Sequence, residues 1–188
     1  MLKDLVKQSR SYRSFQPSEG LEPEILRELC DTARFAPAAI NLQLLKYRLV
    51  YEKEEREKLL PLTYWAGSLG IKLPPDGHEP AAFIVICHDT TLSQEKPIFL
   101  IDVGIAAQTI MLAASERGLG GCMLGAFNPD DVRACLNIPE ELNPKLILAL
   151  GIPDETVVLT DVKDRVKYYR DENNVHYVPK RPLDEIIL

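Results

Sequence analysis

The side chains of this sequence form no constellation that would catalyse a reaction alone. Its histidines, His78, His88 and His176, are dispersed, and no Gly-x-Ser-x-Gly elbow is present to hold a nucleophilic serine. Paired carboxylates fall at expected helix starts, where they suit the helix dipole. The four cysteines contain no Cys-x-x-Cys pair, which favours buried reduced thiols over a metal or redox site. An enzyme built from this chain would therefore need a cofactor.

The glycines at 118–121 do not form a nucleotide-binding motif. They follow an expected helix, where the dinucleotide fingerprint needs a strand, and they lack its third glycine. The sequence also has no Gly-x-x-x-x-Gly-Lys-Ser/Thr phosphate loop. The simpler interpretation of these glycines is a helix C-cap followed by a tight turn.

Two small groups of basic residues remain as candidates for anion binding. Arg10 and Arg13 lie near one end of the chain, and Lys180 and Arg181 lie near the other. Each group could hold one small anion, although isolated charges of this kind are usually solvated surface. The net charge of −6 leaves no basic footprint for nucleic acid.

Periodicity and turn residues place these candidates on an α+β framework. The apolar run at 82–87 predicts a central strand. The stretch 98–117 predicts a long helix that is apolar on nearly every face, so we expect it to be buried all round, partly against a partner chain. The other predicted elements are helices at 2–9, 22–36, 52–58 and from 129 after an Asn128 N-cap, strands at 47–51, 123–127 and 145–152, and a loop-rich stretch at 65–80.

The length of 188 residues and the apolar fraction of 46 % suit one domain, residues 1–188. The first residues lack the long apolar core of a secretory signal, and Asp102 and Gln108 interrupt the longest apolar stretch, so we expect a cytoplasmic protein without a membrane span. The segment 153–188 is charged yet ends in apolar residues. Those residues need a surface to cover, which is either the partner subunit or the chain's own domain.

Four segments, in the expected order, resemble the nitroreductase family. Arg10–Phe15 is similar to the family's Arg-Arg-Ser-x-Arg-x-Phe opening, and Ala36–Gln43 is similar to its Ala-Pro-Ser-x-x-Asn-x-Gln segment. Asp102–Gln108 with the glycines that follow resembles its long interface helix and turn, and Pro179–Leu183 resembles its basic C-terminal element. Each motif is weak alone, but together they cover the chain from about residue 8 to the end.

This resemblance implies a three-layer α/β/α fold with a mixed central sheet, assembled as an intertwined homodimer. It implies two FMN molecules per dimer, each at the subunit interface. It also implies ping-pong transfer, in which NAD(P)H reduces the flavin and a nitro-aromatic, quinone or similar acceptor then takes the electrons.

The resemblance also assigns roles to the basic residues. Arg10, Lys180 and Arg181 match the family's ligands for the FMN phosphate, and Ser11 could add a donor there. Arg13 matches the basic residue beside the N1–C2=O edge of the ring, where a fixed positive charge stabilises the reduced flavin.

Apolar and small residues complete the expected site. Ala38, Ala39 and Asn41 match the strip that the partner subunit lays against the ring. Leu124, Gly125 and Ala126 match the turn whose backbone N–H points at N5 of the flavin. Asp102 matches a polar position near the pyrimidine edge, although it could instead satisfy a buried donor.

Three departures from the family pattern put FMN affinity and acceptor choice in doubt. Ser9 replaces an arginine, Ala38 replaces a common serine, and Leu44-Leu45 replaces a common Pro-Trp pair. Two alternatives therefore stay open: a flavin-binding or flavin-storage protein without turnover, and a structural domain whose motifs have drifted. The sequence fixes neither the physiological acceptor nor the choice between NADH and NADPH.

Overall fold

The computed structural model describes residues 1–162 and 165–188. Its main sheet has four strands in the order β1-β2-β4-β3, and every neighbouring pair is antiparallel. The strands are β1 (Leu45–Val50), β2 (Ala82–Asp89), β3 (Gly120–Leu124) and β4 (Leu142–Gly151). Because β2 lies inside the sheet and is buried along its whole length, the prediction of a central strand at 82–87 is confirmed.

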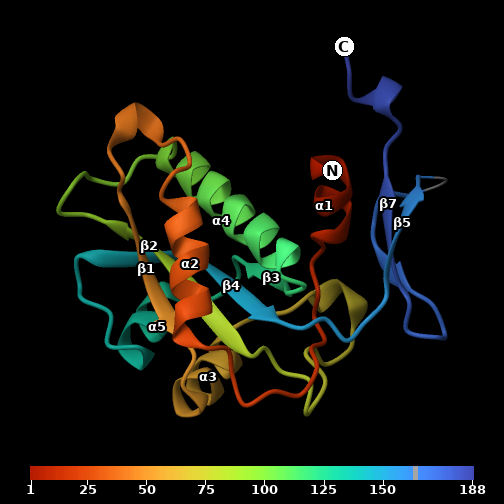
Figure 1. The fold of residues 1–188 in the computed structure, drawn as a ribbon, viewed down its shortest axis with the longest axis horizontal. Coiled ribbons are helices and arrows are strands. Elements are labelled where there is room, and N and C mark those ends of the chain that lie inside the picture. Colours follow the sequence, from red (N-terminus) through yellow and green to blue (C-terminus); the bar gives the residue numbers. More distant parts are fainter. Residues whose placement is uncertain (163–164) are drawn as a thin grey trace.

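The two faces of this sheet carry separate hydrophobic cores, because successive residues of a strand point to opposite sides. Ile84 and Ile86 of β2 pack with α2 (Pro23–Ala33) and α4 (Phe99–Glu116). Phe83 and Val85 pack on the other face with α3 (Lys53–Leu59) and α5 (Pro129–Cys135). Helices therefore cover both faces (Figure 1), and the predicted three-layer α+β fold is confirmed.

Local signals in the sequence set the ends of several helices. Pro23 occupies the first turn of α2, where its missing N–H costs nothing. The Asn128 side chain accepts a hydrogen bond from the Asp130 N–H at 3.0 Å, which is the predicted N-cap of α5. Gly118 adopts a φ of +74° after α4, so the glycines at 118–121 begin with a helix C-cap, as the simpler interpretation of the sequence held.

Within the single chain the helix α4 is buried on one side only, and the predicted burial of its other side against a partner chain stays a prediction. Ala107 and Ile110 are completely buried, whereas Leu100 and Ile101 are 58 % and 56 % exposed. A helix packed on one sheet face and one neighbouring helix cannot bury its whole circumference within a single chain. Within the described residues, α4 is also the one helix whose length and apolar composition would suit a membrane span, and 44 % of it is buried inside this fold.

The N-terminal segment adds to the β3 edge of the main sheet. After α1 (Leu2–Gln8), Ser11 forms a parallel bridge with Gly121, and the Tyr12 N–H donates to the Gly121 carbonyl at 2.9 Å. Phe15 follows, completely buried and bridged to Pro153. This edge supplies the parallel pairing of the mixed sheet.

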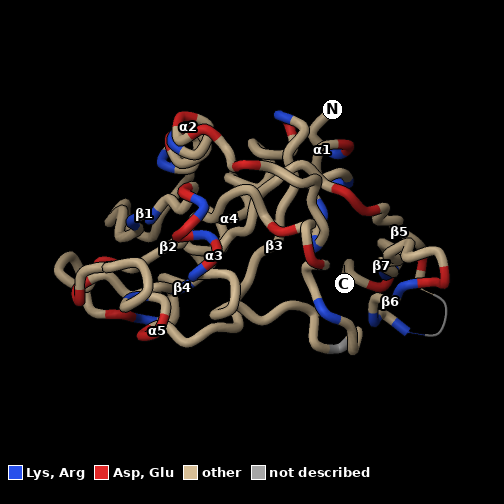
Figure 2. The backbone as a smooth tube through the Cα atoms, turned by 90° about the horizontal axis from the view of Figure 1, so that it is seen from below, with Lys and Arg blue, Asp and Glu red and all other residues tan. Residues whose placement is uncertain are grey.

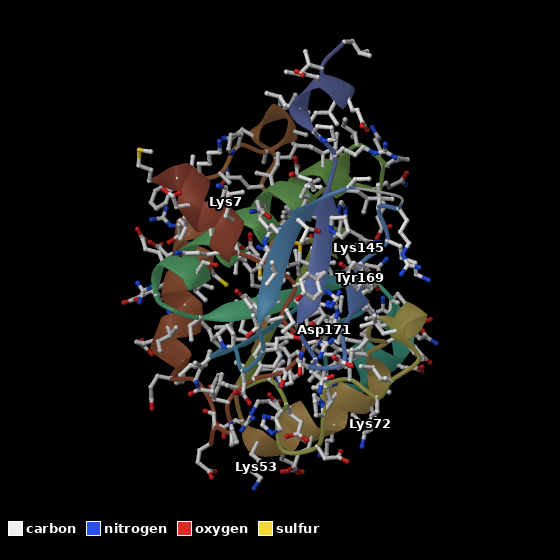
Figure 3. All side chains as sticks on the ribbon, turned by 90° about the vertical axis from the view of Figure 1, so that its right-hand side faces the viewer. Lys7, Lys53, Lys72, Lys145, Tyr169 and Asp171 are labelled. Carbon is white, nitrogen blue, oxygen red and sulfur yellow. The ribbon has the colours of Figure 1, made fainter. Side chains whose placement is uncertain are left out.

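A second sheet forms from the C-terminal segment. It contains β5 (Val157–Asp161), β6 (Tyr169–Arg170) and β7 (His176–Lys180) in the order β5-β7-β6, with β5 and β7 parallel. This sheet stands at one side of the main sheet (Figure 1), and Figure 3 shows it face on with Tyr169 and Asp171 labelled. The last apolar residues of the 153–188 segment, Leu183, Ile186, Ile187 and Leu188, are exposed. Residues 163 and 164 of this segment lie outside the described residues.

The connecting segments hold 3-10 turns at Ala39–Asn41, Leu60–Leu62, Gly67–Leu69 and Leu183–Glu185. The stretch 65–80, predicted to be loop-rich, has no strand or α-helix among its described residues. Lys and Arg are interspersed with Asp and Glu over the chain (Figure 2).

Replacing Gly121 with alanine should lower the midpoint of thermal unfolding, because an added Cβ would lie 2.1 Å from the Ala149 carbonyl oxygen. Overlap of this kind costs about 1–3 kcal/mol, and displacement of β3 would also weaken the bridge to Ser11. The control is Gly67→Ala, since a Cβ there meets nothing within 4 Å. Equal midpoints for the two variants in circular dichroism would contradict the close packing of β3 on β4.

Candidate cofactor site

Arg10 is a partly buried cation without a counter-ion. Its Nη2 donates to the Val6 carbonyl at 2.7 Å, while its Nε is buried and has no partner. In the described ranges, 1–162 and 165–188, no carboxylate forms an ion pair with it. Burial lowers the pKa of Arg10, which reports the cost of holding this charge away from water. Such a guanidinium is a candidate to bind an anionic ligand.

Arg13, by contrast, contacts several residues of the C-terminal segment 153–188. Its side chain is buried, with Nη1 3.1 Å from the Ser11 carbonyl and 3.4 Å from Nε2 of His176. The guanidinium also lies 5.3 Å from the centre of the Tyr168 ring. Its backbone N–H donates to the carboxylate of Glu155. The predicted cofactor residue is thus fixed by contacts from residues more than 140 positions later in the chain.

His176 is the contact of Arg13 that sequence analysis missed. It is 2 % exposed, and burial, followed by the charges of Arg13 and Arg170, lowers the pKa of His176 to about 4. The ring is therefore neutral at neutral pH. Because a guanidinium can only donate, Nε2 must accept from Arg13, which places the proton on Nδ1. That Nδ1 is buried without a partner among the described residues.

The turn after β3 presents an open surface on the same strand edge. Leu124 is buried, whereas Gly125 and Ala126 are exposed. A Cβ at Gly125 would come no closer than 4.0 Å to Leu146, so the packing does not demand glycine there. Ser11 pairs with Gly121 at the start of β3, about 13 Å of strand from this turn. The structure thus brings Arg10, Ser11 and Arg13 onto the same strand edge as residues 124–126.

The residues expected to lie on the other side of the flavin form a separate group. The Ala39 N–H donates to Oδ1 of Asp102 at 2.9 Å, so Asp102 holds the loop that carries Ala38, Ala39 and Asn41. This contact is the alternative role considered for Asp102, a carboxylate that satisfies a backbone donor. The loop is strained, since Ile40 and Asn41 have φ values of +44° and +54°.

The helix α4 separates these two groups. Asp102 lies in its first turn, and β3 begins just after its last residue. Its 18 residues span about 27 Å. In Figure 1 the 38–41 loop lies beside the N-terminal end of α4, whereas α1 and β3 lie at the other end. One chain therefore does not bring the two groups together.

Lys180 and Arg181 lie on the exposed C-terminal arm. Lys180 ends β7, and Nη1 of Arg181 donates to Glu185 at 3.0 Å in an exposed ion pair. Such pairs contribute little to stability and are easily exchanged for another anion. Neither residue contacts Arg10 in the described structure, so their joint role at one phosphate stays a prediction.

The structure also limits the chemistry that protein groups could supply. All four cysteines are free thiols, and burial raises the pKa of Cys30 and Cys87 to about 12, so neither is a ready nucleophile. Among the residues that the structure describes, no group of three or more His, Cys, Asp or Glu could hold a metal ion.

The structure thus defines a three-layer α+β domain with a cationic strand edge at one rim. The sequence profile of the nitroreductase family matches residues 6–70 and 75–152, which include the Arg10–Arg13 segment, the 38–41 loop and the whole main sheet. The chain therefore belongs to the nitroreductase family.

Individual relatives agree with this assignment. A protein from Methanothermobacter thermautotrophicus, provisionally named NADH dehydrogenase/NAD(P)H nitroreductase, is 29 % identical over 165 residues, covering 86 % of this chain and 82 % of its own. The crystal structure of a nitroreductase family protein from Clostridium difficile 630 is 26 % identical, with a TM-score of 0.69 and coverage of 98 % and 95 %. An FMN-dependent nitroreductase from Clostridium difficile R20291 is 25 % identical, with a TM-score of 0.66 and coverage of 80 % and 87 %.

Acidification should destabilise the protein through His176. Its folded pKa of about 4 lies below the usual 6.5, so between these values the unfolded chain binds a proton that the folded chain does not. Stability is therefore lost as the pH falls through this window, by at most about 3 kcal/mol. We expect the free energy of unfolding, measured with urea at a series of pH values, to fall less steeply with decreasing pH in His176→Phe than in the wild type. Parallel curves would show that His176 does not stay neutral in the folded state.

Proposed function

We propose that this protein is an FMN-dependent oxidoreductase that uses NAD(P)H to reduce nitro-aromatic, quinone or similar acceptors by ping-pong transfer. The observation that carries the proposal is Arg10 on the β3 edge of a nitroreductase-family domain. Its guanidinium is partly buried and, among the described residues, has an unpartnered Nε and no counter-ion. Two relatives, one named as an NADH dehydrogenase/NAD(P)H nitroreductase and one as an FMN-dependent nitroreductase, support the donor and the cofactor.

The residues present fit FMN as a ligand. Arg10 would hold the phosphate, with Ser11 beside it and Lys180 and Arg181 as further cations. Arg13 would place its buried positive charge at the ring's pyrimidine edge, and residues 124–126 would leave one approach to the ring open. When bound, FMN takes up a hydride from the nicotinamide and passes electrons to the acceptor. The residues of the chain would then bind and orient the flavin and hold positive charge beside it, and no side chain would act as acid or base.

A second copy of the chain would complete the site. Each chain holds the cationic group at one end of α4 and the Ala38–Asn41 loop at the other, so neither end alone encloses a flavin. A two-fold axis that sets two α4 helices side by side would bring one chain's loop to the other chain's cations. The exposed Leu100 and Ile101 supply an apolar surface for that contact, and the apolar residues after Arg181 supply another.

We also propose a cytoplasmic location, without a nucleic-acid or membrane partner. The free thiols and the net charge of −6 support it.

The proposal is tested on the purified full chain. We expect a yellow protein, or one that gains flavin absorbance on mixing with FMN, and we expect oxidation of NADH or NADPH when menadione or nitrofurazone is added. Arg10→Ala should weaken FMN binding roughly tenfold or more, the loss of a charge-assisted contact. Arg27→Ala, an exposed arginine on α2, is the matched control. No flavin uptake would refute the proposal, and bound flavin without NAD(P)H oxidation would favour flavin storage.

The dimer is tested by placing a charge on the uncovered face of α4. Ile101→Glu should give a monomer in size-exclusion chromatography and should lose FMN together with the dimer, because a buried carboxylate at an apolar interface is costly. The control is Leu92→Glu, a similarly exposed apolar residue on the loop after β2. A variant that stays dimeric with its flavin would place the interface elsewhere.

A further inference from the structure

The Glu155 carboxylate lies beside the N-terminal segment that carries the candidate cations. Its side chain is 4 % exposed, and its two oxygens have different partners. Oε1 accepts the backbone N–H of Arg13, and Oε2 forms an ion pair with the Arg170 guanidinium. The side chain of Arg170 is 11 % exposed, so both charges are largely shielded from water. Charges held in this way act on their neighbours more strongly than charges on the surface do.

This ion pair and Arg13 belong to one cluster, of which His176 is the fourth member. Arg170 of β6 lies opposite His176 of β7 in the second sheet, and the His176 ring lies 3.4 Å from the Arg13 guanidinium. After burial, the charges of Arg13 and Arg170 both lower the pKa of His176. Because His176 is neutral at neutral pH and Glu155 offsets Arg170, these four side chains carry one net positive charge.

The cluster lies against β3, the strand that leads to the turn at 124–126. Cys122 of β3 reports this position. Burial raises the pKa of its thiol, the charge of Arg13 lowers it, and the charge of Glu155 raises it. The segment that carries Arg13 is also bridged to β3 through Ser11. A change in the charge of the cluster therefore acts on the same strand edge that carries the candidate cofactor residues.

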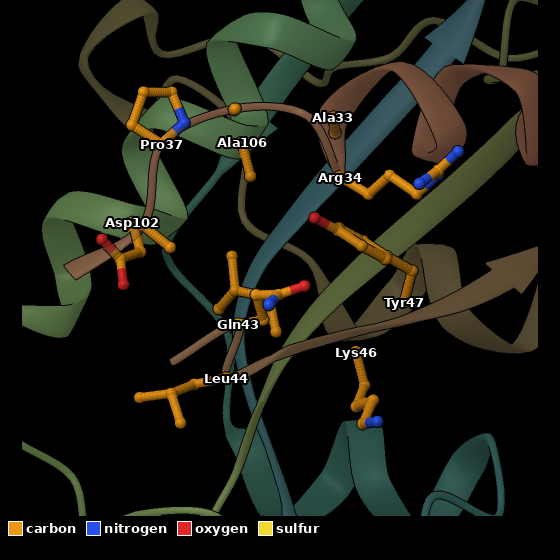
Figure 4. A pocket seen from close by; sticks show the side chains of 12 residues that line it. Ala33, Arg34, Pro37, Gln43, Leu44, Lys46, Tyr47, Asp102 and Ala106 are labelled. Carbon is orange, nitrogen blue, oxygen red and sulfur yellow. The ribbon is translucent and has the colours of Figure 1, made fainter. Parts of the chain in front are cut away.

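The buried carboxylate of the other group of candidate residues has no such cation. Asp102 accepts the Ala39 N–H without an ion pair among the described residues, and Figure 4 shows the charged ends of Arg34 and Lys46 turned away from it. A buried carboxylate in this fold thus holds a backbone N–H without a guanidinium beside it. Arg170 therefore does more than help Glu155 to hold the N–H of Arg13: it cancels a negative charge close to the Arg13 side chain.

We infer that Glu155 and Arg170 are positioning residues for the proposed flavin reaction: their ion pair fixes the backbone at Arg13 and sets the net charge that the flavin ring meets. This inference rests on the proposed function. Removing the charge of Glu155 would leave Arg170 as a second, uncompensated cation, whereas removing the charge of Arg170 would leave a carboxylate beside Arg13. Added positive charge favours the reduced, anionic form of the flavin, and added negative charge disfavours it.

Two substitutions with opposite effects on charge test this inference in the full chain loaded with FMN. Glu155→Gln should raise the midpoint potential of the bound flavin, and Arg170→Gln should lower it. Each should change the ratio of the affinities for reduced and oxidised flavin roughly tenfold, which is about 30 mV for a two-electron couple. The double variant should return close to the wild type. The control variants, Arg48→Gln and Glu55→Gln, remove the charges of an ion pair between β1 and α3, with β1 at the opposite edge of the main sheet.

Opposite shifts separate charge from structure, because a loss of packing alone would not move the two single variants in opposite directions. Shifts of equal sign, or shifts no larger than those of the control variants, would overturn the inference. If Glu155→Gln does not fold, Arg170→Gln is compared with Arg170→Lys, which keeps the charge and loses the guanidinium fork. Only Arg170→Gln should then lower the potential, and equal potentials for these two variants would overturn the inference.

A second readout needs no flavin. Hydrogen exchange of the Arg13 backbone amide, measured by NMR on the FMN-free chain, should be at least about tenfold faster in Glu155→Ala, because the amide loses its acceptor. Glu55→Ala should leave this exchange unchanged, and equal exchange in Glu155→Ala and the wild type would contradict the positioning of Arg13. A wild type that takes up no FMN would refute the proposed function, while a wild type that binds FMN but whose two charge variants shift alike would overturn this inference alone.

Discussion

The parallel bridge between Ser11 and Gly121 holds the cation-bearing segment against the edge of the main sheet. Without this bridge, Arg10 and Arg13 would lie on a free chain end, and water would solvate both side chains without holding them in fixed positions. Two glycines permit this arrangement: Gly121 lets β3 approach β4 closely, and Gly120 leaves room for the Tyr12 side chain of the segment. Phe15 then anchors the far end of the segment by complete burial. Backbone packing therefore determines where the positive charge of the candidate site lies.

The long helix α4 separates the two groups of candidate site residues, which lie at opposite ends of the helix. Its first turn carries Asp102, which holds the strained 38–41 loop through the Ala39 N–H, and its C-cap leads directly into β3. Strain in a loop persists only where the surroundings over-determine it. Ile40 at the centre of this loop is exposed, so the loop is held through the neighbouring Ala39 N–H and not by burial of Ile40.

The sequence predicted the layers of this fold well, because apolar runs and caps act locally. The run at 82–87, the Pro23 and Asn128 helix starts and the glycine C-cap after α4 all depend on near neighbours. The contact of His176 with Arg13 could not be predicted, since it joins residues 163 positions apart and neither residue has a local signature of it. The expected cover of the exposed side of α4 by a partner chain stays a prediction, because composition reports how apolar a helix is and not which copy of the chain covers it.

The two arginines of the N-terminal segment are compensated in different ways, and the difference bears on what the edge can bind. Near Arg13, the carboxylate of Glu155 is engaged by the Arg170 guanidinium and by a backbone N–H, so it does not neutralise the Arg13 side chain. One partner of the Arg13 side chain, His176, accepts a hydrogen bond while staying uncharged at neutral pH. Arg13 is thereby fixed in position, whereas Arg10 keeps an Nε without a partner among the described residues. Under the proposed function these two arginines suit a ligand with negative charge at two places. Arg10 would meet the permanent charge, and the fixed Arg13 would meet the charge that develops during reaction.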